Sequence, residues 1–346
     1  SDLFSAFLVR CSELGTEHSN IGVMSPNVWM YIASHERLRT FLTESSALYS
    51  LVELPLTGFK GATVQICAYN FSNKRSPNLR GVYIRLVDFK GADEEMATLT
   101  KEAIRNNDCG WFYRASAADF KKIPGSPIAY WVSPAVIEVF ENKTPLSNEF
   151  PVKSGIMTGN DQLYLRLWCE TSIEKISFGL NDSSQMSSYW YPLSKGGDFR
   201  KWFGNNQHII NLRHDGYDIK NSGGNFRLRE PIWYFKSFVT WSRISSASIA
   251  FRYLHSGVLF ADAAPGIFAE AQCTRLIAML NSKIGNYFLA AINPTLTYQT
   301  NDIERLPAVV RDDPCDIERL ISIAKMDWDS YESSWDFANL PLLNPD

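Results

Sequence analysis

Residue types that hold metals or activate water are present in this sequence, but their spacing is loose. Asp119 is followed by Glu141 and Lys143, which resembles the acidic and lysine residues of a nuclease core, yet such a triplet occurs by chance in most chains. The five histidines lack the spacing of metal ligands, the pair His208 and His214 included. No H-E-x-x-H, G-x-S-x-G, P-loop or G-x-G-x-x-G motif occurs. The sequence therefore predicts no metal site, and generic motifs identify no catalytic residue.

One aromatic residue lies in a glycine-flanked turn directly before an apolar strand. The segment from Gly58 to Phe71 reads GFKGATVQICAYNF, and Phe59 is the residue in the turn. A phenylalanine at this place can fill the core at a strand end, or it can offer its face to a nucleobase. Spacing alone favours the core role.

Charge is unevenly distributed, although the formal net charge is only −3. Residues 195–256 contain ten Lys or Arg and four Asp or Glu, a local balance of +6. Residues 302–346 contain eleven acidic and four basic residues, a balance of −7. A basic stretch of this kind can form a face that binds nucleic acid, although two solvated surfaces of opposite charge would give the same arithmetic.

The composition is that of a packed globular protein. With 45% hydrophobic and 21% charged residues in 346, disordered, collagen-like and coiled-coil chains are excluded. No segment reaches the roughly 18 consecutive apolar residues of a membrane helix, so we expect no membrane contact. The six scattered cysteines favour reduced thiols over a disulfide or zinc framework. Because the chain opens at Ser1 without Met or a signal-peptide pattern, we expect a piece of a longer, cytoplasmic protein.

Helical and strand patterns alternate in the first part of the chain. Apolar residues at helical spacing predict helices over residues 2–14, 34–43, 93–107 and 134–141. Short apolar runs predict strands at 21–24, 48–54, 63–71 and 82–89. The alternation predicts an α/β fold with a largely parallel sheet, and its small size indicates the second half of a Rossmann-like, doubly wound sheet.

The pattern changes near residue 145. Short aromatic runs punctuated by glycines predict many short strands with long loops, an α+β body. Helical patterns cover residues 271–291 and, after the α+β body, 316–332. We therefore predict three parts, over residues 1–145, 146–310 and 311–346, the last being a C-terminal helical segment.

Long stretches of the sequence resemble one enzyme family. Two segments carry the resemblance: SDLFSAFLVRCSELGTEHSNIGVMSPNVWM and LVELPLTGFKGATVQICAYNF. They resemble the later motifs of gamma-class adenine-N6 DNA methyltransferases, and most of all those of the PglX-type enzymes of phage-defence (BREX) systems. PglX-type sequence is also similar to GIMTGNDQLYLRLW, GGDFRKWFG and NPTLTYQTNDIERLP. The resemblance covers essentially the whole chain. It implies the second half of a methyltransferase sheet followed by a DNA target-recognition domain over residues 146–310.

The resemblance implies roles for four residues of the catalytic part. In the family, the helix beside the site of the methyl donor S-adenosylmethionine begins with an acidic residue or Asn, then Leu, then an aromatic residue. Asp2, Leu3 and Phe4 match this pattern. An aromatic residue before the last catalytic strand stacks on the flipped-out adenine, which matches Phe59. Extruding a base costs a few kcal/mol, and stacking returns on the order of 1–3 kcal/mol. No metal is implied.

The implied target-recognition domain would contact double-stranded DNA at phosphates and at base edges in the major groove. Thr158 and Asn160 lie in GIMTGND, which resembles the loop that opens such domains. The remaining candidate contacts come from the basic stretch: Lys195, Arg200, Lys201, Arg227, Arg229 and Arg243. A short helix is predicted within GGDFRKWFG, and a strand on which Arg227 and Arg229 point the same way. Each of these charges is equally consistent with a solvated surface.

Two family motifs do not occur. The 346 residues contain no N-P-P-Y or D-P-P-Y, which holds the adenine amine in the family, and no glycine-rich motif for S-adenosylmethionine. Both lie upstream of the Asp2 motif in the family. The sequence therefore predicts the C-terminal part of a methyltransferase, and we expect this chain by itself to bind no S-adenosylmethionine measurably and to be inactive.

Two other interpretations stay open. The chain could be a non-catalytic DNA-binding or scaffold module of a defence complex, or the specificity region of a restriction-modification enzyme whose nuclease lies elsewhere. In a BREX setting the full enzyme would mark host DNA and meet other phage-defence proteins. The basic stretch would also suit an acidic, DNA-mimicking phage inhibitor, because both ligands present ordered negative charge.

Overall fold

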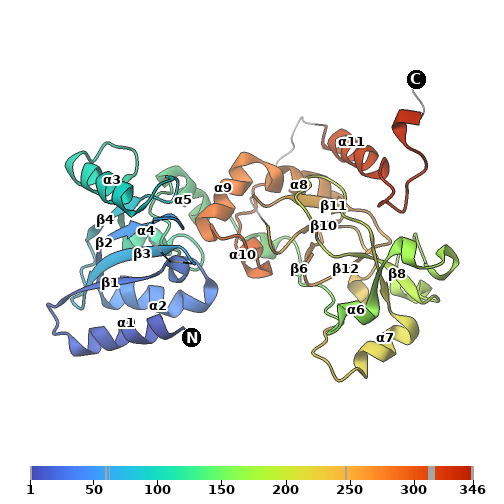
Figure 1. Cartoon of the computed structure of the whole chain (residues 1–346), viewed down its shortest axis with the longest axis horizontal. Coiled ribbons are helices and arrows are strands. Elements are labelled where there is room, and N and C mark those ends of the chain that lie inside the picture. The colour runs from blue at the N-terminus through green and yellow to red at the C-terminus, as the bar shows by residue number, and fades with distance from the viewer. Residues whose placement is uncertain (1, 59–60, 62, 246–247, 311–315, 344–346) are drawn as a thin grey trace. The chain divides into compact units, whose positions relative to one another are not determined.

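The computed structural model describes the chain except for residues 1, 59–60, 62, 246–247, 311–315 and 344–346 (Figure 1). The chain divides into two compact units. The first unit comprises Ser1–Lys143 and Ala291–Pro294, and the second comprises Thr144–Ala290 and Thr295–Asp346. The segment after residue 311 thus belongs to the second unit. The three functional parts stay predictions.

A five-stranded sheet with the order β1-β3-β2-β4-β5 forms the centre of the first unit. Its strands are β1 (Asn20–Pro26), β2 (Ala47–Glu53), β3 (Ile66–Ser72), β4 (Arg80–Arg85) and β5 (Phe112–Ser116). β3 lies between β1 and β2 and is antiparallel to both, so β1 and β2 run in the same direction. β2 and β4 pair in parallel, and β4 and β5 pair antiparallel. The prediction of a largely parallel sheet is wrong, because β3 and β5 each return beside the strand before them.

Helices cover both faces of this sheet (Figure 1). They are α1 (Leu3–Leu14), α2 (Glu36–Thr40), α3 (Asp93–Arg105), α4 (Ala117–Lys121) and α5 (Pro134–Asn142). Successive residues of a strand point to opposite faces. Tyr83 therefore packs in one core with Leu8 of α1 and Leu38 of α2, whereas Ile84 packs in another core with Met96 of α3. The first unit is an α/β structure with helices on both sides of the sheet.

The second unit contains two four-stranded sheets of short strands. One has the order β11-β10-β13-β6 and consists of β6 (Val152–Lys153), β10 (Phe238–Trp241), β11 (Phe251–Leu254) and β13 (Gly266–Ile267). The other has the order β12-β8-β9-β7 and consists of β7 (Leu165–Leu167), β8 (Trp190–Ser194), β9 (His208–Asn211) and β12 (Leu259–Phe260). Buried aromatic residues fill the cores of the second unit, among them Tyr191, Phe235, Phe238 and Phe260. The prediction of an α+β body with many short strands is confirmed.

The chain from residue 144 onward contains further α-helices. They are α6 (Asp161–Tyr164), α7 (Arg213–Lys220), α8 (Cys273–Asn281), α9 (Lys283–Ile292), α10 (Thr300–Glu304) and α11 (Ile317–Asp329). The single helix predicted over residues 271–291 is two helices, α8 and α9, because Ser282 adopts an extended backbone with ψ of 162°. Gly285 permits the close passage that follows, since a Cβ there would lie 2.2 Å from the carbonyl oxygen of Met279.

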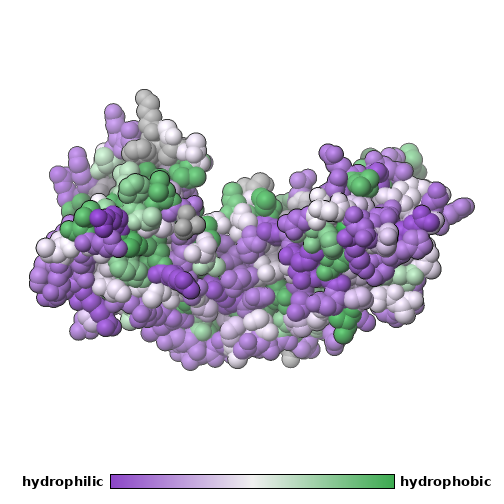
Figure 2. All heavy atoms as spheres, turned by 90° about the horizontal axis from the view of Figure 1, so that it is seen from below, coloured by the Kyte–Doolittle hydropathy of each residue, from purple (hydrophilic) through white to green (hydrophobic). Residues whose placement is uncertain are grey.

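Polar residues dominate the face of the molecule shown in Figure 2, with hydrophobic residues in smaller groups between them. Within the described ranges, no helix has the length and apolar character needed to cross a membrane.

Candidate functional site

The loop that contains Phe59 follows the carboxyl end of β2; Phe59 itself lies outside the described residues. Because β1, β2 and β4 run in the same direction, their carboxyl ends meet at one edge of the sheet, where α/β proteins commonly bind ligands. Gly58 allows the chain to pack closely against Pro55 and Met96 near this edge, since a Cβ there would lie 2.8 Å from Pro55 Cδ and 3.2 Å from Met96 Cγ. The role predicted for Phe59 stays a prediction.

Two of the three residues predicted to border the methyl-donor site, Asp2 and Phe4, contact a histidine that the sequence did not indicate. Asp2 Oδ2 lies 3.3 Å from His35 Nε2, and the ring of Phe4 lies 5.3 Å from the His35 ring. Leu3 is 71% exposed, and the Asp2 side chain is 67% exposed. A cofactor site encloses most of its ligand. These three residues by themselves therefore do not enclose S-adenosylmethionine, and their role at the border of its site stays a prediction.

A buried carboxylate that the sequence analysis missed lies at the same edge of the sheet as the Phe59 loop. Glu53, the last residue of β2, is 2% exposed. Its Oε1 accepts hydrogen bonds from Asn27 Nδ2 and the Tyr31 hydroxyl, each at 3.0 Å. Its Oε2 accepts one from the Tyr130 hydroxyl at 2.7 Å, and Arg85 Nη1 is 3.9 Å away. Both oxygens of this carboxylate are therefore satisfied, as a buried carboxylate requires.

Electrostatics keep the two tyrosine hydroxyls of this network protonated. Burial, and then the charge of Glu53, raise the pKa of Tyr31 and of Tyr130 well above 10, so both hydroxyls stay protonated and donate. Burial lowers the pKa of Arg85, but Glu53 and Asp88 outweigh it and raise the pKa overall. The Arg85 guanidinium also lies 4.4 Å from the centroid of the Trp131 ring.

The network joins segments that would otherwise be independent. Asn27 directly follows β1, Glu53 ends β2 and Arg85 ends β4. Tyr130 comes from a segment without regular secondary structure before α5. The carboxyl ends of three strands are thus held together at the point where the Phe59 loop begins. A glutamate within the apolar run LYSLVEL was the signal in the sequence that could have identified it.

In the second unit, the predicted DNA contacts near residue 160 form a local cluster around Asp161. The Thr158 hydroxyl donates to Asp161 Oδ1 at 2.6 Å, and Lys195 Nζ lies 2.8 Å from Asp161 Oδ2. Asn160 caps α6 by accepting a hydrogen bond from the Leu163 amide at 3.3 Å. Burial raises the pKa of Asp161, but its hydrogen bonds from Lys195 and Thr158 outweigh this and lower it overall.

A second carboxylate, Asp262, collects two of the predicted arginines. Arg227 and Arg243 form ion pairs with its two oxygens, and the Ser154 hydroxyl donates to it at 2.6 Å. Arg227 takes part in a single bridge to Met157 and not in a strand, so the strand predicted to align Arg227 and Arg229 is not formed.

The predicted short helix in residues 196–204 is also not formed; the segment has bends and one bridge, from Trp202 to Arg252. Arg200 Nη1 lies 2.9 Å from Asp327 Oδ2, and its guanidinium carbon is 5.0 Å from the Trp328 ring centroid. Lys201 Nζ donates to the Asn281 carbonyl at 3.1 Å. Part of the acidic C-terminal stretch thus neutralises part of the basic stretch.

Arg229 differs from the other seven candidates. Among the residues that the structure describes, its side chain has no hydrogen bond or ion pair, and its Nε is buried. Burial, and then the charge of Arg227, lower its pKa. As contacts to DNA, all eight residues stay predictions. In the described part of the chain, no group of three or more His, Cys, Asp or Glu could hold a metal ion.

Comparison with known proteins identifies close relatives of the sequence. No family model matches the chain. It is 33% identical over 368 residues to the adenine-specific methyltransferase PglX of Lacticaseibacillus casei (strain Zhang), an alignment that covers 99% of this chain and 30% of PglX. It is 32% identical over 351 residues to the adenine-specific methyltransferase BrxX of Escherichia coli O9:H4 (strain HS), covering 99% of this chain and 28% of BrxX.

A solved structure shares the fold. The type IIL restriction-modification enzyme MmeI, determined in complex with DNA, matches with a TM-score of 0.53 at 11% identity over 97% of this chain and 46% of MmeI. The resemblance to PglX-type sequence that the motifs indicated is confirmed by the two sequence relatives. The chain spans about 30% of their length, and along nearly all of its own length it corresponds to a segment of the PglX- and BrxX-type adenine-specific methyltransferases.

Proposed function

We propose that this chain is part of a site-specific adenine-N6 DNA methyltransferase and supplies target recognition together with the later part of the catalytic sheet. The observation that carries the proposal is the 32–33% identity to PglX and BrxX over 99% of the chain. The fold shared with MmeI, an enzyme determined in complex with DNA, supports it. The second unit would position double-stranded DNA, and its basic residues would contact phosphates and base edges.

In this proposal S-adenosylmethionine supplies the methyl group that the full enzyme transfers to the adenine amine. Asp2, Leu3 and Phe4 would lie at the border of its site, and Phe59 would stack on the extruded adenine. The Glu53 network supports a positioning role, because it fixes the carboxyl end of β2 from which the Phe59 loop departs. Modification of host DNA in phage defence, in the cytoplasm and beside other defence proteins, is the biological setting that we propose.

Mapping of N6-methyladenine tests the proposal. Genomes of a host with and without the gene for the intact protein would be sequenced by a method that reads methylated bases directly. We expect one adenine of a short recurring sequence to be methylated only when the gene is present. If the intact protein binds DNA but leaves it unmethylated, that result would contradict the catalytic role and favour a non-catalytic DNA-binding module.

The fold shared with MmeI also favours a second candidate, the specificity region of a restriction-modification enzyme. Incubating the intact protein with unmethylated plasmid distinguishes the two functions. Cleavage at a fixed distance from one sequence would support the restriction-modification role. Methylation of that sequence without cleavage would support the first proposal.

A further inference from the structure

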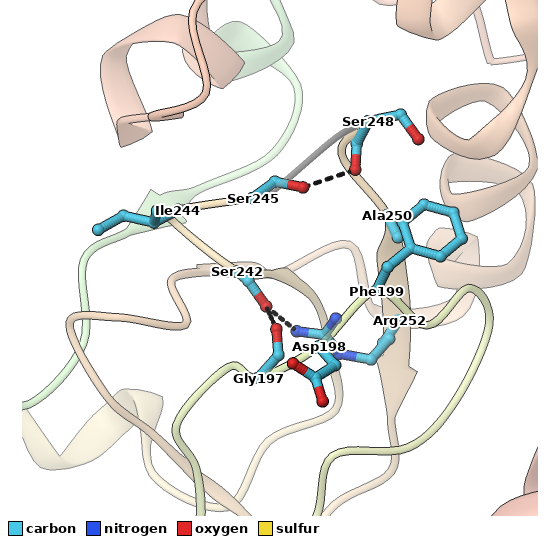
Figure 3. A pocket seen from close by; sticks show the side chains of 9 residues that line it. All are labelled: Gly197, Asp198, Phe199, Ser242, Ile244, Ser245, Ser248, Ala250 and Arg252. Atoms are coloured by element: carbon cyan, nitrogen blue, oxygen red, sulfur yellow. Dashed lines mark hydrogen bonds between the residues drawn. The ribbon is translucent and has the colours of Figure 1, made fainter. Parts of the chain in front are cut away.

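A cavity of about 270 Å³ lies in the second unit beside the β10–β11 pair (Figure 3). Arg252 of β11 and Ser242, the residue after β10, contribute side chains to its wall. Gly197 and Asp198 approach from the neighbouring loop, and Ile244 borders the cavity with 73% of its surface exposed. The backbone of Gly197 has a φ of 127°, and a Cβ there would lie 3.0 Å from the Asn205 side chain. The loop is thus packed closely along one side of the cavity.

Arg252 is a buried cation with too few acceptors. It is 1% exposed, and among the described residues its side chain makes one hydrogen bond, from Nη2 to the Ser242 hydroxyl at 3.1 Å. Its Nε is buried and has no hydrogen-bond partner in the described part of the chain. No carboxylate oxygen of the described residues lies within 4.0 Å of it, and burial lowers its pKa to about 10, so it stays protonated at neutral pH. A buried charge of this kind is costly unless something pairs with it.

Other arginines of the chain show what a satisfied guanidinium looks like. Arg39 in the first unit is completely buried, and it donates to the carbonyl oxygens of Trp29, Ile32 and Gly125. Arg227 and Arg243 both pair with Asp262. Within the described ranges Arg252 has neither a carbonyl nor a carboxylate acceptor, but it borders a cavity that can admit a ligand. Packing within the described residues therefore does not account for its position.

We propose that this cavity binds a phosphate group, with Arg252 as the fixed cation and the Ser242 hydroxyl beside it, and that the phosphate belongs to the backbone of bound DNA. The second part rests on the proposed function, whereas the first does not. A guanidinium offers planar, paired donors that match a phosphate. A volume of about 270 Å³ exceeds the roughly 30 Å³ share of one water and leaves room for a phosphate group. The exposed carboxylate of Asp198 at the border would weaken such binding without preventing it.

The first test uses inorganic phosphate and the intact protein at constant ionic strength, with chloride as the balancing anion. We expect phosphate to raise the unfolding temperature of the wild type, and Ile244→Glu to abolish that increase. Ile244→Gln is the matched control, because glutamine has the shape of glutamate without its charge, and this variant should behave as the wild type. Because Ile244 is exposed, neither variant depends on refolding the core. No phosphate effect in the wild type, or an equal effect in Ile244→Glu, would overturn the site.

Two more variants change the site directly. Arg252→Met should abolish the phosphate effect, and Asp198→Asn should increase the affinity for phosphate several-fold, since it removes the competing charge. If Asp198 were instead the counter-ion of Arg252, Asp198→Asn would lower the unfolding temperature without phosphate and leave the affinity unchanged. That result would contradict the proposal.

The second test asks where the phosphate comes from. If it belongs to DNA, Ile244→Glu should weaken binding of all duplexes alike and make the log–log salt slope shallower by about 0.9, one phosphate contact, whereas Ile244→Gln should not. A phosphate effect with an unchanged DNA slope would overturn the DNA source and assign the site to a free phosphate. A wild type that binds no DNA would refute the proposed function, and the inorganic-phosphate test would still decide the site.

Discussion

The hydroxyl of Tyr130 donates a hydrogen bond of 2.7 Å to Glu53 Oε2 and so joins two residues 77 positions apart in the sequence. The other oxygen of Glu53 accepts from Tyr31 and Asn27. All three partners are donors, so the centre of the network must be an acceptor on both oxygens. A carboxylate meets this requirement, and an amide does not.

We expect Glu53→Gln to lower the free energy of unfolding by about 1–3 kcal/mol, because its amide nitrogen would face a donor and leave a buried hydroxyl without an acceptor. Urea denaturation of wild type and variant measures the difference. Glu17→Gln is the matched control, since Glu17 is exposed and has no side-chain partner among the described residues, and it should stay within about 0.5 kcal/mol. Equal losses in both variants would contradict the network's role.

For Phe59→Ala we expect a loss of methylation by the intact enzyme with stability and duplex affinity retained. Stacking on an extruded base is worth about 1–3 kcal/mol, which corresponds to a decrease in rate of about 5- to 150-fold. Phe59→Tyr keeps the aromatic face and should keep most of the activity. A phenylalanine in a core instead costs about 3–5 kcal/mol of stability when replaced by alanine, and a loss of that size would assign Phe59 to the core.

Local patterns were enough to predict most elements of the first unit. The spacing of Leu3, Phe7 and Cys11 predicted α1, and the apolar run at residues 48–54 predicted β2. The direction of the strands was not predictable in this way, because the place of β3 between β1 and β2 depends on pairing between distant segments. The break at Ser282 was missed for a related reason: the apolar pattern continues through this residue, although the helical conformation of the backbone is interrupted there.

Counting charges along the chain identified a basic stretch but not its partners. Of the residues that the structure describes, three carboxylates outside residues 195–256 pair with basic residues inside that stretch: Asp161, Asp262 and Asp327. Such pairs form only when the chain folds, so local arithmetic overstates the free positive charge. Burial of a charged residue is equally invisible to it. Arg252, which lies in the run FRYL, is one of the ten basic residues in that count although it is buried.

Two histidines of the second unit should make stability depend on pH. Burial, and then the charge of Lys195, lower the pKa of His208, and burial, and then Lys325, lower that of His255. The unfolded chain, with a pKa of about 6.5 for each, binds more protons below that pH than the folded chain does. The stability from keeping them neutral is therefore complete above about pH 6.5 and is lost as the pH falls through the folded pKa values.

Urea denaturation at a series of pH values measures this dependence. His208→Gln and His255→Gln should each make the fall in stability below about pH 6.5 less steep. The exposed His18, changed to Gln, serves as the control and should leave the profile unchanged. Profiles that stay parallel to the wild type in both variants would show that the acid sensitivity comes from other groups.

The pair Arg200 and Lys201 tests whether the basic stretch contacts DNA despite its internal partners. If both bind phosphates, the Arg200→Ala/Lys201→Ala double variant should make the log–log salt slope of DNA binding shallower by up to about two units. Asp327→Asn is the informative companion, because it frees Arg200 from its ion pair and should strengthen binding if Arg200 contacts DNA. Fluorescence anisotropy over a salt series measures both effects, and weaker binding in Asp327→Asn would contradict a contact by Arg200.

Arg229 offers the sharpest test, because its side chain has no hydrogen bond or ion pair within the described residues and can be changed without leaving a partner uncompensated. We expect Arg229→Gln to weaken DNA binding while the free energy of unfolding stays within about 0.5 kcal/mol of the wild type. A phosphate contact would weaken all sequences alike and reduce the salt slope by about 0.9, whereas a base contact would cost about 1–3 kcal/mol and relax one position of the site. Lys74→Gln, an exposed basic residue of the first unit, is the control for net charge. Affinity and slope equal to those of this control would mean that the DNA does not reach Arg229.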